Sequence, residues 1–234
     1  SRGLGDVYKR QLQGIVFLGG RFDYTPADLA MLNVPFVCCS YSNRYGTLIE
    51  GEYSSVSIAD GDTAQQAVEE LYRHGHRRIA ALISRPNDQS ISQLRYEGYV
   101  QALESHGIPV DPELVISTGG FSAKDAYRAV QEKMAENVDF TALFAIADSM
   151  AIGAMRALMD AGRRIPEDCS VIAIDGLELS AYIEPPLTTL CQPMEEIGRR
   201  SAEILLDMVQ HKGSHACELL PTTLRQGRSV AAPR

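Results

Sequence analysis

Asp175 stands directly after a run of four apolar residues, Val171 to Ile174, that is typical of a buried strand. In open parallel α/β sheets, ligands bind beyond the carboxyl ends of the strands, because helix N-termini and short loops bring free backbone N–H groups together there. A carboxylate at such a place can accept two hydrogen bonds from neighbouring hydroxyls of a polyol. The same spacing also fits a structural role, in which Asp175 caps the short helix suggested by residues 177–182.

The segment before Asp175 has the pattern of a strand and a helix that would position this carboxylate. Residues 142–147 are apolar and indicate a buried strand. Asp148 or Ser149 could be the N-cap of the next helix, with Asp148 favoured, and Gly162 would end that helix. Apolar residues recur at helical spacing within it, namely Met150, Ile152, Met155, Leu158 and Met159.

Strands and helices alternate along the rest of the chain. The apolar patterns predict strands at 14–20, 36–39, 56–58, 78–84, 114–117 and about 217–220. Capping and stop signals predict a helix that opens at 25–28 and helices over 60–74, 92–106, 123–135 and about 194–211. Strands that alternate with helices in this way predict an α/β fold with one parallel sheet or two.

Composition narrows the class of protein. The 234 residues suffice for one large or two small domains, and no apolar run is long enough to span a bilayer. The net charge of −8 argues against direct contact with nucleic acid, which would require a basic surface. Five cysteines without a C-x-x-C pair indicate free thiols rather than a disulfide framework. A cytoplasmic protein without a membrane partner is therefore expected.

The sequence carries no recognised motif for catalysis. The sequence has no nucleophile elbow, phosphate-binding loop, dinucleotide fingerprint or zinc-protease motif. His74 and His76 flank Gly75 at a helix end, where imidazoles usually meet the last carbonyl groups rather than a metal. No catalytic residue, cofactor or metal site is predicted, so the chain is not expected to be an enzyme.

Residues 1–11, SRGLGDVYKRQ, do not fit the pattern that follows them. The peptide DVYKRQ is what translation of GATGTGTATAAGAGACAG gives, and this DNA resembles the transposase end sequence used in preparing sequencing libraries. We expect these residues to be a non-native leader and the native protein to begin near Leu12 and to extend upstream. An ordinary polar N-terminal segment is the alternative.

Several strings together resemble the lactose-repressor (LacI/GalR) family of bacterial transcription regulators. They are GHRRI at 75–79, RYEGY at 95–99, ADSMAIGAMRAL at 147–158, RRIPEDCSVIAID at 163–175, PPLTTL at 185–190 and LPTTL at 220–224. The match covers nearly everything after residue 12, in the expected order and spacing.

The resemblance implies an effector-binding domain of two lobes with the periplasmic-binding-protein-like (type I) fold. Three crossovers would lie near residues 58–60, Gln192 and Cys217. The first lobe would take about 12–58 and 193–214, and the second about 59–192 and 215–234. The family carries a helix-turn-helix headpiece and two strand–helix units upstream, so the first lobe would be incomplete. It also implies a homodimer that contacts operator DNA only through the headpiece.

Four residues match positions that line the family's effector cleft. Arg95 matches an arginine whose planar fork can bind ligand oxygens, and Asp175 matches the cleft aspartate. Phe121 falls where an aromatic can stack on a sugar ring, although core packing is the alternative. Gln192 matches a polar position facing the cleft, or a structural hinge contact.

Two positions depart from the family pattern and leave the ligand open. Ala147 stands where a polar residue is common, and Ser40 stands where a strand-ending aspartate is common. Each change removes a hydrogen-bonding group from the expected sugar site.

The resemblance therefore implies the effector-binding part of a LacI-type repressor, which binds a sugar or related small polar molecule. The ligand would shift the arrangement of the lobes and thereby the affinity for the operator. A periplasmic sugar-binding protein of a transport system is the alternative, since it has the same two-lobed plan.

Overall fold

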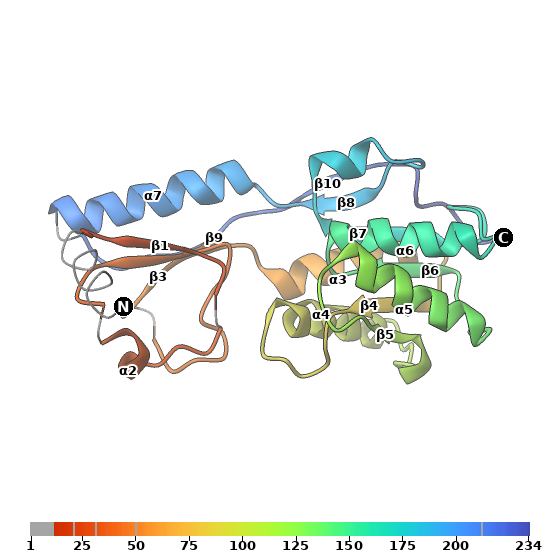
Figure 1. The fold of residues 1–234 in the computed structure, drawn as a ribbon, viewed down its shortest axis with the longest axis horizontal. Helices are drawn as coiled ribbons and strands as arrows, with labels where there is room; N and C mark the ends of the chain where they lie inside the picture. Colours follow the sequence, from red (N-terminus) through yellow and green to blue (C-terminus); the bar gives the residue numbers. More distant parts are fainter. Residues whose placement is uncertain (1–11, 21, 31, 50, 212) are drawn as a thin grey trace, which may run out of the picture. The chain divides into compact units, whose positions relative to one another are not determined.

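The computed structural model describes residues 12–234 except 21, 31, 50 and 212, and the predicted non-native leader lies outside the described residues. The chain divides into two compact units. Unit 1 contains the chain up to Ile58 together with Pro193–Pro221, and unit 2 contains Ala59–Gln192 together with Thr222–Arg234 (Figure 1). The chain therefore passes from one unit to the other three times.

Unit 1 is built on a four-stranded parallel sheet in the order β1-β2-β3-β9. Its strands are β1 (Ile15–Leu18), β2 (Phe36–Cys39), β3 (Ser54–Ser57) and β9 (Cys217–Leu219). The long helix α7 (Met194–His211) packs on β1, β2 and β3. The helix α2 (Pro26–Leu29) has only four residues, although Thr25 and Asp28 form the capping box that its sequence indicates.

Unit 2 is built on a six-stranded sheet in the order β10-β8-β7-β6-β4-β5. Its strands are β4 (Ile79–Ile83), β5 (Val115–Ser117), β6 (Ala142–Ala145), β7 (Ser170–Asp175), β8 (Thr188–Cys191) and β10 (Thr223–Arg225). All neighbours are parallel except β8 and β10. The central strands β4 and β6 are buried along their whole length, as expected for a parallel sheet covered on both faces.

Four helices cover the two faces of this sheet as two pairs (Figure 1). One pair is α3 (Asp60–Arg73) with α4 (Ile91–Ser105), and the other is α5 (Ala123–Ala135) with α6 (Asp148–Asp160). The chain steps outward from β4 to β5 and then back past β4 to β6, so the strand order reverses between β4 and β6. In folds of this kind, the carboxyl ends of the strands at that reversal form the usual ligand site.

Close packing of α3 on α4 depends on a glycine. A Cβ atom on Gly98 would lie 2.1 Å from the carbonyl oxygen of Gly61, which is too close for any other residue. This approach brings the first turn of α3 beside the second turn of α4. Short 3-10 helices at Pro112–Leu114 (η1) and Glu178–Ala181 (η2) complete the unit.

The α/β fold with parallel sheets is confirmed, two local expectations are corrected, and one strand is added. Asp148 is the first residue of α6 rather than its N-cap, a position that Ala147 occupies. The third passage between units lies at Pro221–Thr222 rather than near Cys217, because β9 pairs with β3 of unit 1. The strand β10 was not expected from its three residues alone. Among the described residues, none of the helices has the length and apolar character needed to cross a membrane.

Candidate functional site

Arg95 lies at the centre of a buried ion network at the strand-order reversal of unit 2. It occupies the second turn of α4, whose N-terminus is capped by the hydroxyl of Ser90, and it is only 1% exposed. Its Nε donates to Asp60 Oδ1 at 2.9 Å, and its Nη1 donates to Asp175 Oδ1 at 3.1 Å. Nη1 also donates to the carbonyl oxygen of Ile146, just after β6. One guanidinium thus joins α3, α4, β6 and β7.

Burial and charge act in opposite directions on these groups. Burial raises the pKa of Asp60, and the guanidinium of Arg95 opposes that rise. Burial favours neutral Arg95, but the carboxylates of Asp60 and Asp175 outweigh it and raise the pKa of the guanidinium further. Arg95 is therefore a permanent cation at this place, flanked by two acidic groups.

Asp175 is the part of this network that reaches solvent. Its side chain is 24% exposed, whereas those of Arg95 and Asp60 are 2% and 5% exposed. Its Oδ1 accepts hydrogen bonds from Arg95 and from Gln192 Nε2, the latter at 2.8 Å. The backbone of Asp175 has a φ of 134°, and Gly176 follows with a φ of 77°. A non-glycine residue held at such a φ is strained, and such strain concentrates at functional sites.

One donor of this network is not used within it. Arg95 Nη2 is buried and has no hydrogen-bond partner among the described residues. A buried donor without a partner is costly, so a site that contains one favours a ligand able to accept from it. Together with the partly exposed carboxylate of Asp175, this makes the network the candidate site for a small molecule that both donates and accepts hydrogen bonds.

A second buried carboxylate, Asp148, lies beside this network at the start of α6. It is fully buried, and its Oδ2 accepts from the backbone N–H of Leu177 at 2.8 Å and from Ser180 Oγ at 2.6 Å. Its Oδ1 accepts from Thr189 Oγ1 at 2.6 Å. Burial raises the pKa of Asp148, and these hydrogen bonds counteract the rise.

Three of the six predicted site residues come together. Arg95, Asp175 and Gln192 are directly hydrogen-bonded. Asp175 does not cap η2, because Leu177 occupies the N-cap position and no side chain of the described residues caps this helix. The alternative structural role of Asp175 as a helix cap is therefore wrong.

The other three predicted residues lie around or away from this group. Ala147 follows Ile146, whose carbonyl oxygen Arg95 binds, and is 5% exposed. Phe121 is 41% exposed, so it is not a core residue, and its carbonyl oxygen accepts from Ser149 Oγ on α6 at 2.9 Å. Ser40 belongs to unit 1, where it follows β2 with a φ of 69° and donates its N–H to Val56.

The sequence did not reveal the contacts that Asp60 and Asp148 make in this region. Asp60 was assigned to a crossover and to the start of a helix, and Asp148 to a helix cap. The partner of Asp60 lies 35 residues away in the sequence, and the partners of Asp148 lie 29 to 41 residues away. No local spacing therefore signals these contacts. For Asp60, the available signal was its place shortly after a buried strand, at the start of the next helix.

Each of the three points at which the chain passes between the units lies close in sequence to a residue that forms hydrogen bonds in this region. Asp60 follows the first passage, and Gln192 is the last residue before the second. Arg225 lies shortly after the third and donates to the carbonyl oxygens of Gly176 at 3.4 Å and Leu177 at 3.1 Å. The turn at Asp175 is therefore bonded, directly or through Arg95, to all three connecting segments.

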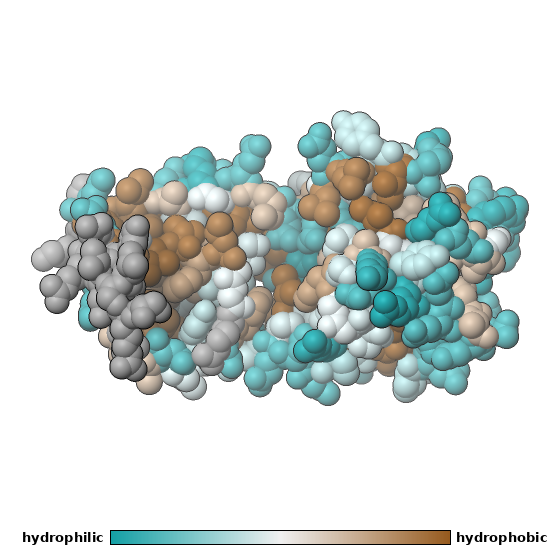
Figure 2. Space-filling model, viewed as in Figure 1, coloured by the Kyte–Doolittle hydropathy of each residue, from teal (hydrophilic) through white to brown (hydrophobic). Residues whose placement is uncertain are grey.

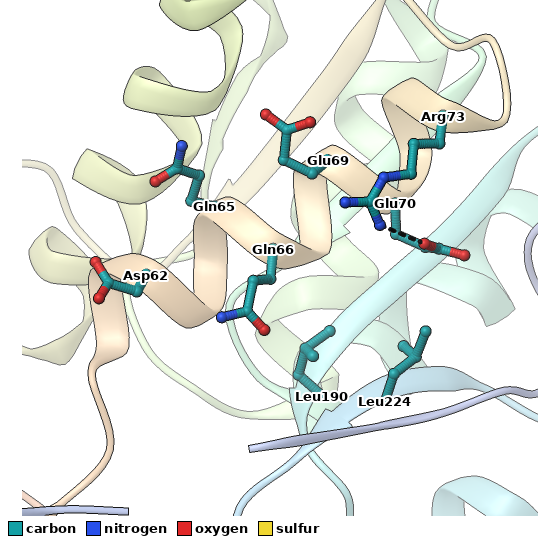
Figure 3. A pocket seen from close by; sticks show the side chains of 8 residues that line it. All are labelled: Asp62, Gln65, Gln66, Glu69, Glu70, Arg73, Leu190 and Leu224. Carbon is teal, nitrogen blue, oxygen red and sulfur yellow. Dashed lines mark hydrogen bonds and ion pairs between the residues drawn. The ribbon is translucent and has the colours of Figure 1, made fainter. Parts of the chain in front are cut away.

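A separate groove of about 500 Å³ lies between α3 and the strands β8 and β10 (Figure 3). Gln66 and Glu70 face Leu190 and Leu224 across it, and Glu70 is paired with Arg73 at 3.4 Å. None of the predicted site residues lines it. In the part of the chain that the structure describes, no group of three or more His, Cys, Asp or Glu side chains could hold a metal ion.

Comparison with known proteins agrees with the fold. Residues 68–230 match the family of periplasmic binding protein-like domains. The transcriptional regulator MalR of Clostridium butyricum is 34% identical over 222 residues, which are 94% of this chain and 65% of MalR. The chain thus spans just under two thirds of that relative's length.

Two solved structures are similar to the whole chain. The transcriptional regulator CelR in complex with cellobiose has a TM-score of 0.86 and 31% identity, over 98% of this chain and 69% of CelR. A LacI family regulator from Enterococcus faecium with bound ribose has a TM-score of 0.82 and 28% identity, over 100% of this chain and 85% of its own. The chain belongs to the periplasmic binding protein-like family, within the group of LacI-type transcriptional regulators.

Proposed function

We propose that this chain is the effector-binding part of a LacI-type transcriptional regulator, and that its effector is a sugar or related polyol bound at Asp175 and Arg95. The observation that carries the proposal is the buried guanidinium of Arg95, which has one N–H group without a partner beside a partly exposed carboxylate. Such a pair offers one donor and one acceptor at fixed positions.

The chemistry of this pair suits neighbouring hydroxyl groups. A hydroxyl both donates and accepts, so one can donate to Asp175 while another accepts from Arg95. Gln192 holds the carboxylate in place by donating to the same oxygen that Arg95 binds. The named ligands of two similar proteins, cellobiose and ribose, support a carbohydrate. Phe121, exposed near the N-terminus of α6, would supply an apolar ring for one face of the sugar.

Effector binding would reach the rest of the molecule through the three connecting segments. Asp60, Gln192 and Arg225 stand next to the passages between the units and are bonded to the turn at Asp175 or to Arg95. A ligand that favours one conformation of these segments shifts the population toward it. This is the means by which an effector would change the affinity of the regulator for DNA.

For the whole protein, we propose a homodimeric cytoplasmic regulator that binds operator DNA through an N-terminal headpiece. The relatives named above are transcriptional regulators, which favours this role over a transport receptor. A dimer face is suggested by Leu177, Leu179 and Tyr182, which are 44%, 63% and 78% exposed. Figure 2 shows apolar atoms gathered over the part of unit 2 that contains η2.

A thermal-shift screen with neutral mono- and disaccharides, including ribose and cellobiose, tests the proposal. A sugar at about 100 times its Kd stabilises the folded state by about 2.7 kcal/mol, which raises the Tm by several degrees. D175N should bind the same sugar about 10- to 100-fold more weakly, since each charge-assisted hydrogen bond contributes about 1.5–3 kcal/mol. D160N, the same change on the exposed end of α6, is the matched control and should bind like the wild type. Equal affinity in D175N and D160N would contradict the placement of the site.

A further inference from the structure

The carboxylate of Asp148 is buried without a close cationic partner. Among the described residues, it forms one long ion pair, with Arg225, whose Nη2 lies 4.0 Å from Oδ2. The charge is balanced instead by three neutral donors, Leu177 N–H, Ser180 Oγ and Thr189 Oγ1, and by the N-terminus of α6, where Asp148 is the first residue. Two of the three donors belong to the segment that directly follows Asp175.

The turn at Asp175 needs such support because its backbone is strained. Asp175 has a φ of 134°, a value that residues other than glycine rarely adopt. A conformation of this kind persists only when the surrounding contacts hold it. Leu177 N–H on Asp148 fixes the chain two residues after Asp175, and Gln192 N–H on the carbonyl oxygen of Asp175, at 3.1 Å, fixes the other side.

The neighbouring residue packs against a thiol, which makes the turn observable. A Cβ atom on Gly176 would lie 2.5 Å from Cys191 Sγ, so the turn covers one side of this cysteine. Asp175 and Cys191 are also paired residues of β7 and β8. Cys191 is already partly exposed, and a displacement of the turn would uncover it further.

We propose that Asp148 is a positioning residue, whose buried carboxylate holds the Asp175–Leu177 turn so that the carboxylate of Asp175 is aimed at the effector. This role rests on the proposed function of Asp175 and extends it to a residue that does not itself contact the ligand. Asparagine is an imperfect substitute. It removes the negative charge, and with its oxygen on the Leu177 N–H its amide nitrogen would face Thr189 Oγ1, whose hydroxyl would then have to accept instead of donate.

The test labels Cys191 with iodoacetamide in the full 234-residue chain and reads each cysteine by mass spectrometry. Cys217 is exposed and is changed to serine in all variants, while Cys38, Cys39 and Cys169 are buried. D148N should raise the labelling rate of Cys191 about fivefold or more and leave Cys169, in the core of unit 2, unlabelled. Labelling of Cys169 as well would report unfolding of the unit rather than movement of the turn.

Two further variants separate movement of the turn from the loss of charge. Burial raises the pKa of the Cys191 thiol, and the charge of Asp148 adds to that rise, so D148N changes the ionisation of the thiol too. Labelling is therefore followed from pH 7 to 10. S180A keeps the charge and removes the donor that η2, which follows the turn, gives to Asp148, and it should raise the rate about two- to threefold. T189V removes the donor on β8 only and should leave the Cys191 rate within twofold of the wild type.

Effector binding completes the test. For the sugar found in the screen, D148N should bind at least tenfold more weakly, while D160N binds normally. If Cys191 is labelled at the wild-type rate in folded D148N and S180A, Asp148 does not hold the turn, and the proposal fails even if Asp175 binds the effector. If the turn moves in D148N but the affinity is unchanged, Asp148 does not position the binding carboxylate and the proposal fails as well.

Discussion

Asp60 and Asp148 are two buried aspartates at the same edge of one sheet, yet their charges are balanced in different ways. Asp60 faces a guanidinium that is itself left with one unpartnered N–H group. Asp148 accepts three hydrogen bonds from uncharged donors and has a cation no closer than 4.0 Å. We call the arrangement around Asp60 and Arg95 open, because one N–H group is left for a ligand. We call the arrangement around Asp148 closed, because its hydrogen bonds are all made within the protein, which suits the task of holding a turn.

The largest effect should follow from removing the cation of the open arrangement. R95M leaves Asp60 buried without its partner and should lower the free energy of unfolding of unit 2 by about 3–5 kcal/mol. Urea unfolding followed by circular dichroism measures the loss. The double variant D60N/R95M should recover more than half of it, since no unpaired charge remains. If the losses in the free energy of unfolding caused by the two single substitutions simply add in the double variant, the two residues do not depend on each other.

A smaller loss is expected when the closed arrangement is opened. D148A removes the acceptor of the Leu177 N–H and of two hydroxyls, and each buried donor left without a partner costs about 1–3 kcal/mol. Ser180 Oγ also lies 2.8 Å from the carbonyl oxygen of Leu177, so this hydroxyl retains a partner. The free energy of unfolding should fall by about 2–3 kcal/mol in the same urea experiment. A loss larger than that of R95M would reverse the ranking of the two arrangements.

The pH dependence of stability sharpens the comparison further. Burial raises the pKa of both Asp60 and Asp148 above their ordinary value of 3.8. The folded state then binds protons more readily than the unfolded state, so these two groups make stability fall as the pH rises from about 4 through their folded pKa values. Asp168 acts in the opposite sense, because hydrogen bonds from Arg164 lower its pKa and its contribution is lost as the pH falls below 3.8.

Replacing Asp148 by asparagine should therefore make the free energy of unfolding fall less steeply as the pH rises. The urea midpoint, measured from pH 4 to 7, should fall less steeply with rising pH in D148N than in the wild type. D160N provides the control, because the pKa of this exposed group is lowered rather than raised. An unchanged slope in D148N would mean that Asp148 does not titrate differently in the folded and unfolded states.

The smallest effect is expected for an ion pair outside both arrangements. Arg228 and Glu184 approach within 2.8 Å, but their side chains are 67% and 79% exposed. Solvent screens such a pair, and exposed pairs contribute about 0–1 kcal/mol. E184Q should leave the urea midpoint nearly unchanged at low salt. A loss comparable to that of D148A would contradict the view that burial decides the size of these effects.

The regular elements were largely accessible from the sequence because their signals are local. Ala123–Ala135 and Met194–His211 are helices with the predicted bounds, since Ser122 caps the first and Pro193 precedes the second. Strands buried on both faces, such as β6, were recognisable from continuous apolar runs. The family and the α/β fold followed from these patterns and from the motifs.

The contacts of the site were less accessible, because they join distant parts of the chain. Asp175 was predicted from its place after a buried strand, and Arg95 and Gln192 were predicted through the family resemblance, but neither composition nor spacing would have paired them. Asp60 was missed since its partner lies 35 residues away. Asp148 was taken for a helix cap because a capping aspartate and one that binds Leu177 look alike in sequence.

The most direct measurement is hydrogen exchange of the chain with and without a saturating sugar from the screen. Binding at Asp175 and Arg95 should slow the exchange of backbone amides in peptides that cover residues 174–178 and the N-terminal half of α4, and this protection should be lost in D175N. Protection confined to the groove between α3 and β10, or equal protection in D175N, would contradict the proposed site.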